Sequence, residues 1–134
     1  MSGERQGTPL DDNKAAIRHY FEEVVNKGNL ALLDKTVSGN AETLRQAISM
    51  FIAAFPDART TIDDMIAEGD KVVVRSTTRA THKGALMGLQ PTGRSVRYAG
   101  VDIFRLEGGR IAEHWFVRDY LTLMEQLGMM PKFR

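Results

Sequence analysis

Cysteine is missing from this 134-residue chain, and its absence excludes several kinds of protein at once. Without thiols there is no disulfide bond, no thiolate metal site and no cysteine nucleophile. A chain without disulfides suits a reducing compartment, so we expect a cytoplasmic protein.

Long apolar runs and an excess of one charge are missing too. Residues 1–10 do not form the apolar stretch of a secretory signal, and no segment reaches the roughly 20 apolar residues that a membrane helix needs. The 18 lysine and arginine residues are matched by 17 aspartate and glutamate residues. A balanced chain does not attract a polyanion. We therefore expect no membrane association and no nucleic-acid partner.

The composition that remains is that of a globular protein. Hydrophobic residues make up 43% of the chain and charged residues 26%, which are ordinary values for a soluble domain. A domain of this length buries roughly two thirds of the surface of its unfolded chain, which is enough for a core without covalent staples. We predict one domain over residues 1–134, with a flexible N-terminus over residues 1–10.

The first 55 residues carry apolar side chains at helical spacing. The clearest stripe consists of Ile17, Tyr20, Phe21, Val24 and Val25. Asp11 or Asp12 can cap this helix, and Gly28 stands where it would end. Two further helices are predicted over residues 30–33 and 42–55, the second of them stopped by Pro56.

After Pro56 the pattern changes to β-branched residues in alternation, which indicates strands. We predict strands over residues 60–67, 71–78, 95–106 and 110–118, the last two joined at Gly108-Gly109, and a final helix over 120–127. Helices followed by a block of strands favour an α+β fold with an antiparallel sheet.

One segment imitates a phosphate-binding loop. Residues 88–95 read Gly-Leu-Gln-Pro-Thr-Gly-Arg-Ser, with Arg94 in the place of the lysine. A phosphate loop is followed by a helix whose N–H groups converge on the ligand, whereas a strand follows here and Pro91 has no N–H. We interpret this segment as a turn.

From Glu68 onward, short motifs follow one another at consistent spacing. They are Glu68-Gly69-Asp70-Lys71-Val72, Thr81-His82-Lys83-Gly84, the segment 88–93, Phe104-Arg105, the segment 108–115 ending in His114-Trp115, Asp119, and Gln126-Leu127-Gly128. In this ordered set the chain resembles the SnoaL-like polyketide cyclase family, which has the nuclear-transport-factor-2-like fold. The resemblance implies a cone-shaped barrel, in which N-terminal helices close a pocket inside a strongly curved antiparallel sheet.

The resemblance also implies a chemistry. Family cyclases close a ring by intramolecular aldol condensation without metal or cofactor, using an aspartate as general acid/base and a histidine that polarises the carbonyl. The family aspartate corresponds to Phe116 here, and the family histidine corresponds to Asp102. A third pocket residue of the family, the histidine of the Thr-His-x-Gly motif, is retained as His82.

Strand alternation groups the candidate residues. Tyr98, Asp102 and Phe104 share one face of their strand, as His114 and Phe116 do in the next. A three-residue loop would place Asp102 opposite Phe116 with His114 diagonal to it, whereas a two-residue loop would turn one strand over. We predict Asp102, His82 and His114 as catalytic residues, and as substrate-binding residues Tyr20, Phe51, Tyr98, Phe104 and Phe116.

The hypothesis for their chemistry is that the family's carboxylate has moved to Asp102. A carboxylate between Phe104 and Phe116 would lose hydration, which would raise its pKa toward the range of a general base. A neutral histidine nearby could donate to a developing enolate oxygen or hold a water molecule.

Structural interpretations of the same residues remain open. Asp102 and His114 would also make a buried pair that fixes strand register, and His82 would also serve as a turn residue bonded to backbone. Asp119 is most simply the cap of the last helix. Two histidines and Asp102 could form a metal site, but their positions lack ligand spacing, so we predict no metal and no cofactor.

Two hypotheses for function follow. The first is an enzyme that performs acid/base chemistry (aldol cyclisation, isomerisation, dehydration or hydrolysis) on a small hydrophobic carbonyl or epoxide compound in an enclosed pocket. The second is a non-catalytic module of the same fold that binds a small ligand or dimerises. In both, the expected partners are a small hydrophobic ligand and a second copy of the chain, with Trp115 placed on the outer face of the sheet.

Overall fold

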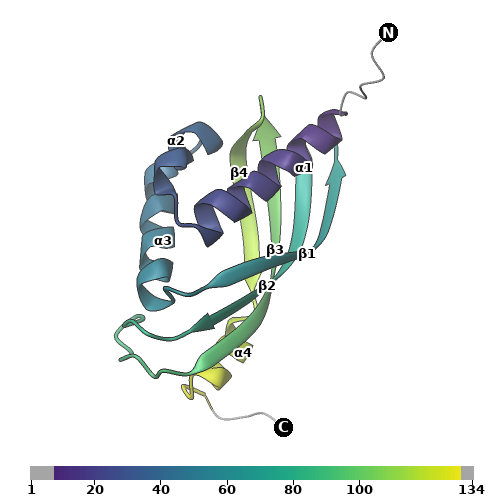
Figure 1. The fold of residues 1–134 in the computed structure, drawn as a ribbon. Helices are drawn as coiled ribbons and strands as arrows, with labels where there is room; N and C mark the ends of the chain where they lie inside the picture. The colour runs from purple at the N-terminus through teal and green to yellow at the C-terminus, as the bar shows by residue number, and fades with distance from the viewer. Residues whose placement is uncertain (1–7, 131–134) are drawn as a thin grey trace.

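The computed structural model describes residues 8–130 and shows an α+β fold (Figure 1). The helical elements are α1 (Pro9–His19), η1 (Tyr20–Asn26), η2 (Leu30–Leu32), α2 (Leu33–Thr36), α3 (Ala41–Ala54) and α4 (Tyr120–Gln126), and the strands are β1 (Arg59–Glu68), β2 (Lys71–Thr81), β3 (Ser95–Glu107) and β4 (Arg110–Arg118). Within this stretch, no helix has the length and apolar character needed to cross a membrane.

The four strands form one antiparallel sheet in chain order, β1-β2-β3-β4. The sheet is curved and does not close on itself; α1 crosses it diagonally and α3 lies at its side (Figure 1). The segment after α2 joins the sheet at its far edge, where Ser38 donates its N–H to the carbonyl of Ile111 at 2.8 Å. The predicted order of helices and strands and the α+β class are confirmed.

The start of the first helix differs from the prediction. Residues 1–7 lie outside the described part of the chain, but the helix already begins at Pro9 and is capped by Thr8. The Thr8 hydroxyl accepts the N–H of Asp11, and the Asp11 side chain accepts the N–H of Thr8 in return. This capping box makes Asp11 the third residue of the helix, so the prediction of Asp11 or Asp12 as the cap was wrong, and Pro9 and Leu10 form the first two residues of the helix.

The apolar stripe predicted as one helix is divided between α1 and the π-helical segment η1. A π-helical turn holds one residue more than an α-helical turn and therefore rotates the side chains that follow it. Tyr20 and Phe21, although neighbours in sequence, are both buried against the sheet, each packing edge-on against Phe104 with ring centres 5.7 and 5.9 Å away. These two adjacent residues thus give two aromatic rings to one core.

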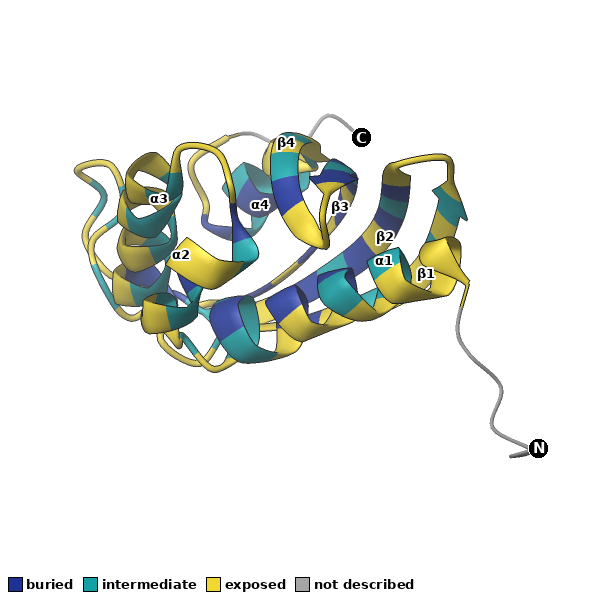
Figure 2. Ribbon diagram, turned by 90° about the horizontal axis from the view of Figure 1, so that it is seen from above, coloured by how far each residue is buried: buried dark blue, intermediate teal, exposed yellow. Residues whose placement is uncertain are grey.

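Two apolar clusters fill the concave side of the sheet (Figure 2). The larger lies under α1 and η1 and includes Ile17, Tyr20, Phe21, Val72, Val74 and Phe104, whereas the smaller lies between α3 and α4 and includes Phe55, Val96, Tyr98, Leu123 and Leu127. Buried polar side chains occupy the same face of the sheet, among them Ser76, Thr78 and Asp102. The interior is therefore apolar at its two ends and polar between them.

The β3–β4 hairpin sets the register of the candidate site. Its turn contains only Gly108 and Gly109, both at positive φ, between the paired residues Glu107 and Arg110. The two-residue turn alone would have turned one strand over, but a bulge at Ala112 adds one residue to β4 and restores the alternation. Asp102 therefore faces Phe116, as predicted, although the three-residue loop expected for this register was wrong.

Two phenylalanines on the same face of the sheet test this packing. Phe104 is fully buried, whereas Phe116 is 54% exposed. Phe104→Ala should lower the free energy of unfolding by about 3–5 kcal/mol because it leaves a cavity in the larger cluster. Phe116→Ala should change it by less than about 1 kcal/mol. Urea denaturation of both variants measures the difference, and equal losses would contradict this description of the core.

Candidate functional site

The centre of the site is a buried carboxylate held by two side chains of β4. Asp102 is 1% exposed. Its Oδ2 lies 2.6 Å from Nε2 of His114, and the Arg118 guanidinium donates to both of its oxygens at 2.8 and 2.9 Å. A buried carboxylate requires such partners, because desolvation without them costs several kcal/mol.

The sheet register explains how the three side chains meet. His114 pairs with Phe104, Phe116 with Asp102, and Arg118 with Gly100, so all lie on the concave face. The imidazole of His114 stacks on the ring of Phe104 with centres 4.3 Å apart. Arg118 reaches Asp102 diagonally across Gly100, where a Cβ would lie 2.9 Å from its Cδ and Nη1 atoms.

The charge state of Asp102 differs from the expectation. Burial raises the pKa of this carboxyl, but the hydrogen bonds from His114 and Arg118 outweigh burial and hold the pKa below its ordinary value. The prediction of a raised pKa was therefore wrong, because it considered the apolar neighbours and not the two donors on β4. Asp102 is an ionised acceptor and a poor proton base.

The same contact defines the proton on His114. An ionised carboxylate accepts hydrogen bonds and donates none, so the 2.6 Å contact places a proton on Nε2 of His114. In the neutral imidazole the other nitrogen, Nδ1, then carries a free lone pair. The side chain of His114 is 17% exposed, so part of the ring is open to a small molecule. Of the two residues, the histidine is the one able to take up a proton.

Three predicted substrate-binding residues surround this pair. Tyr20 and Phe104 pack edge-on with centres 5.7 Å apart, and burial together with the nearby charge of Asp102 raises the pKa of Tyr20, which stays neutral. Phe116 lies 5.3 Å from the His114 ring and 4.9 Å from the Arg118 guanidinium. The pair thus has an apolar wall and an exposed aromatic ring beside it.

His82 lies elsewhere, beyond the end of β2 and against Phe55, with ring centres 5.5 Å apart. Its ring Nδ1 accepts the backbone N–H of Thr92 at 3.1 Å, while the backbone N–H of His82 donates to the carbonyl of Arg94. Among the described residues its Nε2 has no hydrogen-bond partner. The structure does not bring His82 to Asp102 and His114; its backbone and ring hold the turn over 82–94.

Two further predicted substrate-binding residues belong to the smaller cluster with His82. Phe51 packs on Phe55 with ring centres 5.5 Å apart. Tyr98 is buried, and burial raises the pKa of its hydroxyl to about 12. The eight predicted residues therefore form two groups, one around Asp102 and His114 and one around His82.

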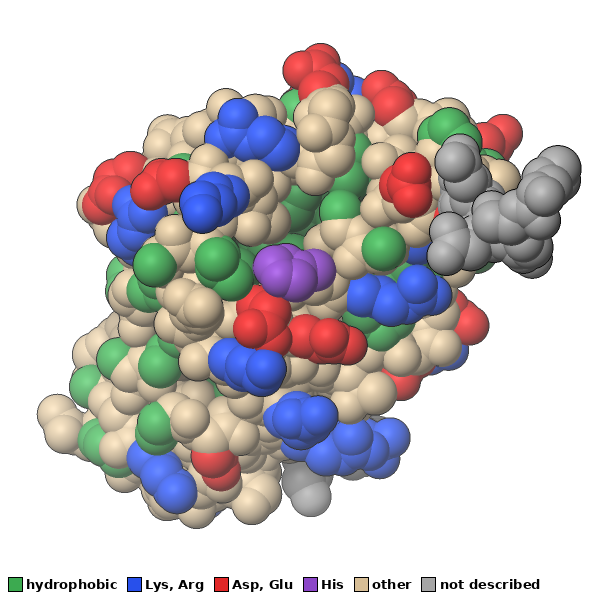
Figure 3. Space-filling model, turned by 45° about the horizontal axis from the view of Figure 1, so that its top comes forward, with side chains coloured by type: hydrophobic (Ala, Val, Ile, Leu, Met, Phe, Trp, Pro, Cys, Tyr) green, Lys and Arg blue, Asp and Glu red, His purple; other side chains and the backbone are tan. Residues whose placement is uncertain are grey.

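Two hollows open on the helical side of the molecule. The first, about 210 Å³, is lined by residues of α1, α2 and the β3–β4 hairpin, including Ala16, His19 and Ile111, and Figure 3 shows hydrophobic side chains on its floor. The second, about 500 Å³, lies along α1, η1 and β1. Asp102 and His114 line neither, so neither is the enclosed pocket predicted around them. Across residues 8–130, no three histidine or acidic side chains gather in a way that could hold a metal ion.

Arg118 is the side chain of this site that the sequence did not single out. Strand alternation puts it on the face of His114 and Phe116, but its type and position alone are compatible with a solvated side chain. The available signal was Gly100, its partner in the register, because a glycine inside a strand often marks a close approach by another group. Asp119, by contrast, caps α4 as predicted, accepting the N–H of Thr122 at 3.1 Å.

The fold and the inward-facing aspartate–histidine pair define a class of small α+β proteins, and comparison with known proteins gives the family. The profile of the SnoaL-like polyketide cyclases matches residues 15–127, so the chain belongs to this family. The comparison with curated protein sequences gave no match.

Solved structures agree with this assignment. AclR, a candidate hydroxylase from Streptomyces galilaeus, is 28% identical with a TM-score of 0.84 over 93% of this chain and 86% of its own. TsrD from Streptomyces laurentii is also 28% identical, with a TM-score of 0.84 over 92% of this chain and 100% of its own. IdmH, a candidate polyketide cyclase from Streptomyces antibioticus, is 28% identical with a TM-score of 0.78 over 87% and 98%.

The lowered pKa of Asp102 predicts how its removal affects stability. Asp102→Asn should lower the free energy of unfolding at pH 7 by about 3 kcal/mol, because Arg118 loses its buried counter-charge. A carboxyl with a lowered folded-state pKa contributes stability above its ordinary pKa of about 4 and loses it as the pH falls through the folded-state value. The difference between wild type and variant should therefore shrink below about pH 4. Urea denaturation from pH 3 to pH 7 measures it, and a difference independent of pH would contradict the assignment.

Proposed function

We propose that this protein is an acid/base enzyme that acts on a small, largely apolar carbonyl or epoxide compound, with His114 as its base. The observation that carries the proposal is the 2.6 Å contact between His114 Nε2 and the buried, ionised Asp102. This contact leaves Nδ1 of a partly exposed imidazole as the proton acceptor, beside the apolar rings of Phe104 and Phe116.

The proposed step is proton transfer from a carbon next to a carbonyl group. The C–H bond breaks, its electron pair forms the enolate, and the proton bonds to Nδ1 of His114. Asp102 keeps its charge and stabilises the imidazolium that forms, while Arg118 keeps Asp102 ionised. Return of the proton to carbon or oxygen regenerates the neutral imidazole.

Family membership supports this chemistry without selecting the reaction. Aldol cyclisation, isomerisation and dehydration begin with loss of a proton next to a carbonyl, and hydrolysis begins with loss of a proton from water. The similar structures include a candidate hydroxylase and a candidate polyketide cyclase. A histidine base held by a carboxylate serves any of these reactions.

A base-catalysed ring opening tests the proposal without knowledge of the natural substrate. The planar, apolar probe 5-nitrobenzisoxazole loses a C–H proton to a base and releases a coloured phenolate. His114→Asn should lower its turnover at least tenfold, and Asp102→Asn should also lower it, because a positioned base contributes about 100-fold or more. The exposed His19 lies away from the pair, so His19→Asn should leave turnover unchanged.

A second function, binding without catalysis, is favoured by one specific observation. The resemblance places the family's acid at Phe116, and Asp102 is fully engaged by His114 and Arg118. In that case the wild type, His114→Asn and Asp102→Asn would open the probe at the same rate. The probe would still shift the NMR signals of the His114 ring in the wild type. That result would contradict the catalytic proposal and support a ligand-binding module.

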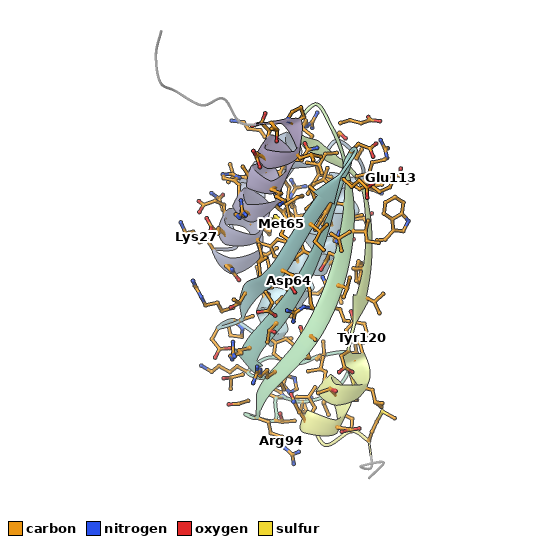
Figure 4. All side chains as sticks on the ribbon, turned by 90° about the vertical axis from the view of Figure 1, so that its right-hand side faces the viewer. Lys27, Asp64, Met65, Arg94, Glu113 and Tyr120 are labelled. Atoms are coloured by element: carbon orange, nitrogen blue, oxygen red, sulfur yellow. The ribbon has the colours of Figure 1, made fainter. Side chains whose placement is uncertain are left out.

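We also propose that the protein forms a homodimer through the convex face of its sheet. Trp115 and Val117 lie on this face and are 46% and 71% exposed. The register joins them to Ile103 and Val101 on β3. The neighbouring charged side chains form ion pairs within the chain, as Arg105 does with Glu113. Figure 4 shows Glu113 on the side of the sheet away from α1. An apolar, charge-balanced face suits a second copy of itself.

Oligomeric state tests this surface. Trp115→Lys should convert a dimer into a monomer, because it places two like charges inside the contact. Met87→Lys is the matched control, since Met87 is 86% exposed but lies in the 82–94 turn. Size-exclusion chromatography with light scattering measures the mass. A wild-type monomer throughout a concentration series would contradict the proposal.

A further inference from the structure

The Arg118 side chain has a role that the proposed base alone does not explain. It forms the only two-pronged contact to Asp102 within residues 8–130, donating from Nη1 to Oδ1 and from Nη2 to Oδ2. Oδ2 also meets Nε2 of His114. The planar guanidinium therefore fixes the plane of the carboxylate, and the carboxylate fixes the imidazole.

We infer that Arg118 is a positioning residue that holds Asp102 so that His114 keeps a single tautomer, with Nδ1 unprotonated and turned toward the substrate. Only the orientation of Nδ1 toward a substrate rests on the proposed function. The chain of hydrogen bonds from Arg118 through Asp102 to His114 can be tested without any turnover. Within residues 8–130 no hydrogen bond joins Arg118 to His114, and in the proposed step Arg118 does not act on the reacting carbon.

Gly100 makes room for the Arg118 side chain that holds Asp102. It faces Arg118 across the β3–β4 register, and a Cβ at this position would lie 2.9 Å from Cδ and Nη1 of Arg118. Its φ is not in the left-handed region, so the backbone itself would accept alanine. The absence of a side chain at Gly100 leaves room for the Arg118 side chain. The Cζ atom of Arg118 lies 4.9 Å from the centre of the Phe116 ring.

The surrounding groups make Arg118 the cation that controls this pair. The charges that act on Asp102 come from β4, namely Arg118 and His114. From η1, Tyr20 faces the pair and stays neutral because burial raises its pKa. Val74, the partner of Asp102 on β2, carries no charge, and Tyr98 on β3 is neutral and buried.

The consequence for the tautomer follows from the two-pronged contact. Without it the carboxylate of Asp102 is free to rotate, and Nε2 of His114 loses its fixed acceptor. Loss of the two-pronged contact without loss of charge should therefore release the tautomer of His114.

The experiment follows the two ring nitrogens of His114 by long-range proton–nitrogen NMR on the full chain, with His114→Asn used to assign the signals. In the wild type we expect one neutral form with the proton on Nε2. Arg118→Gln removes the two-pronged contact together with its charge and should also release the tautomer. Arg118→Lys should give averaged nitrogen shifts that report mixed tautomers, as should Gly100→Ala, which keeps every charged group.

The controls separate position from folding and from function. Arg97→Lys changes an exposed arginine on the other face of β3 and should leave the tautomer as in the wild type. Gly100→Ala keeps the test available where Arg118→Gln fails to fold. A single Nε2–H tautomer in Arg118→Lys and Gly100→Ala would overturn the inference. Equal probe turnover by wild type and His114→Asn would overturn the proposed function and leave this inference standing.

Discussion

The need of one buried carboxylate for partners organises the concave face of this protein. Asp102 is 1% exposed and remains ionised because His114 and Arg118 donate to it. Neither donor would reach it if β4 were shifted by one residue, since such a shift sends every side chain to the opposite face. The ion-paired group thus imposes a register on the hairpin as much as the apolar cores do.

The packing around this charge is correspondingly divided. One apolar cluster lies under α1 and η1 and a second lies between α3 and α4, with polar side chains between them. A uniformly apolar interior would have left Asp102 without compensation. Tyr20 and Phe21 support the same arrangement, because they place two aromatic rings over Phe104, on which His114 stacks.

Periodicity and composition were sufficient to predict the α+β order, the strands and the face on which Asp102, His114 and Phe116 meet. They could not place His82, because alternation says which face a residue occupies but not how far along a long, bent strand it lies. The pKa of Asp102 was misjudged for a related reason. Its two donors lie 12 and 16 residues away, and only the exact register shows that they point at it.

The turn and the bulge of the β3–β4 hairpin reached the predicted register by a different route. The burial pattern fixes how many residues the turn and the bulge contain together. The turn can gain a residue if the bulge loses one, and the reverse. Turn length read from sequence is therefore weaker than side-chain alternation as a guide to this site. The position of Phe116 follows from alternation and needed no knowledge of the bulge.

The bulge at Ala112 also separates two parts of the chain that would otherwise evolve together. Everything beyond it toward Arg118 is in register with β3 through the site, and everything before it belongs to the Gly108-Gly109 tip. The tip can exchange one two-residue turn for another without moving an atom of the hydrogen-bond chain. A tip longer or shorter by one residue, in contrast, would send His114 and Arg118 to the opposite face of the sheet unless the turn or the bulge took up the change.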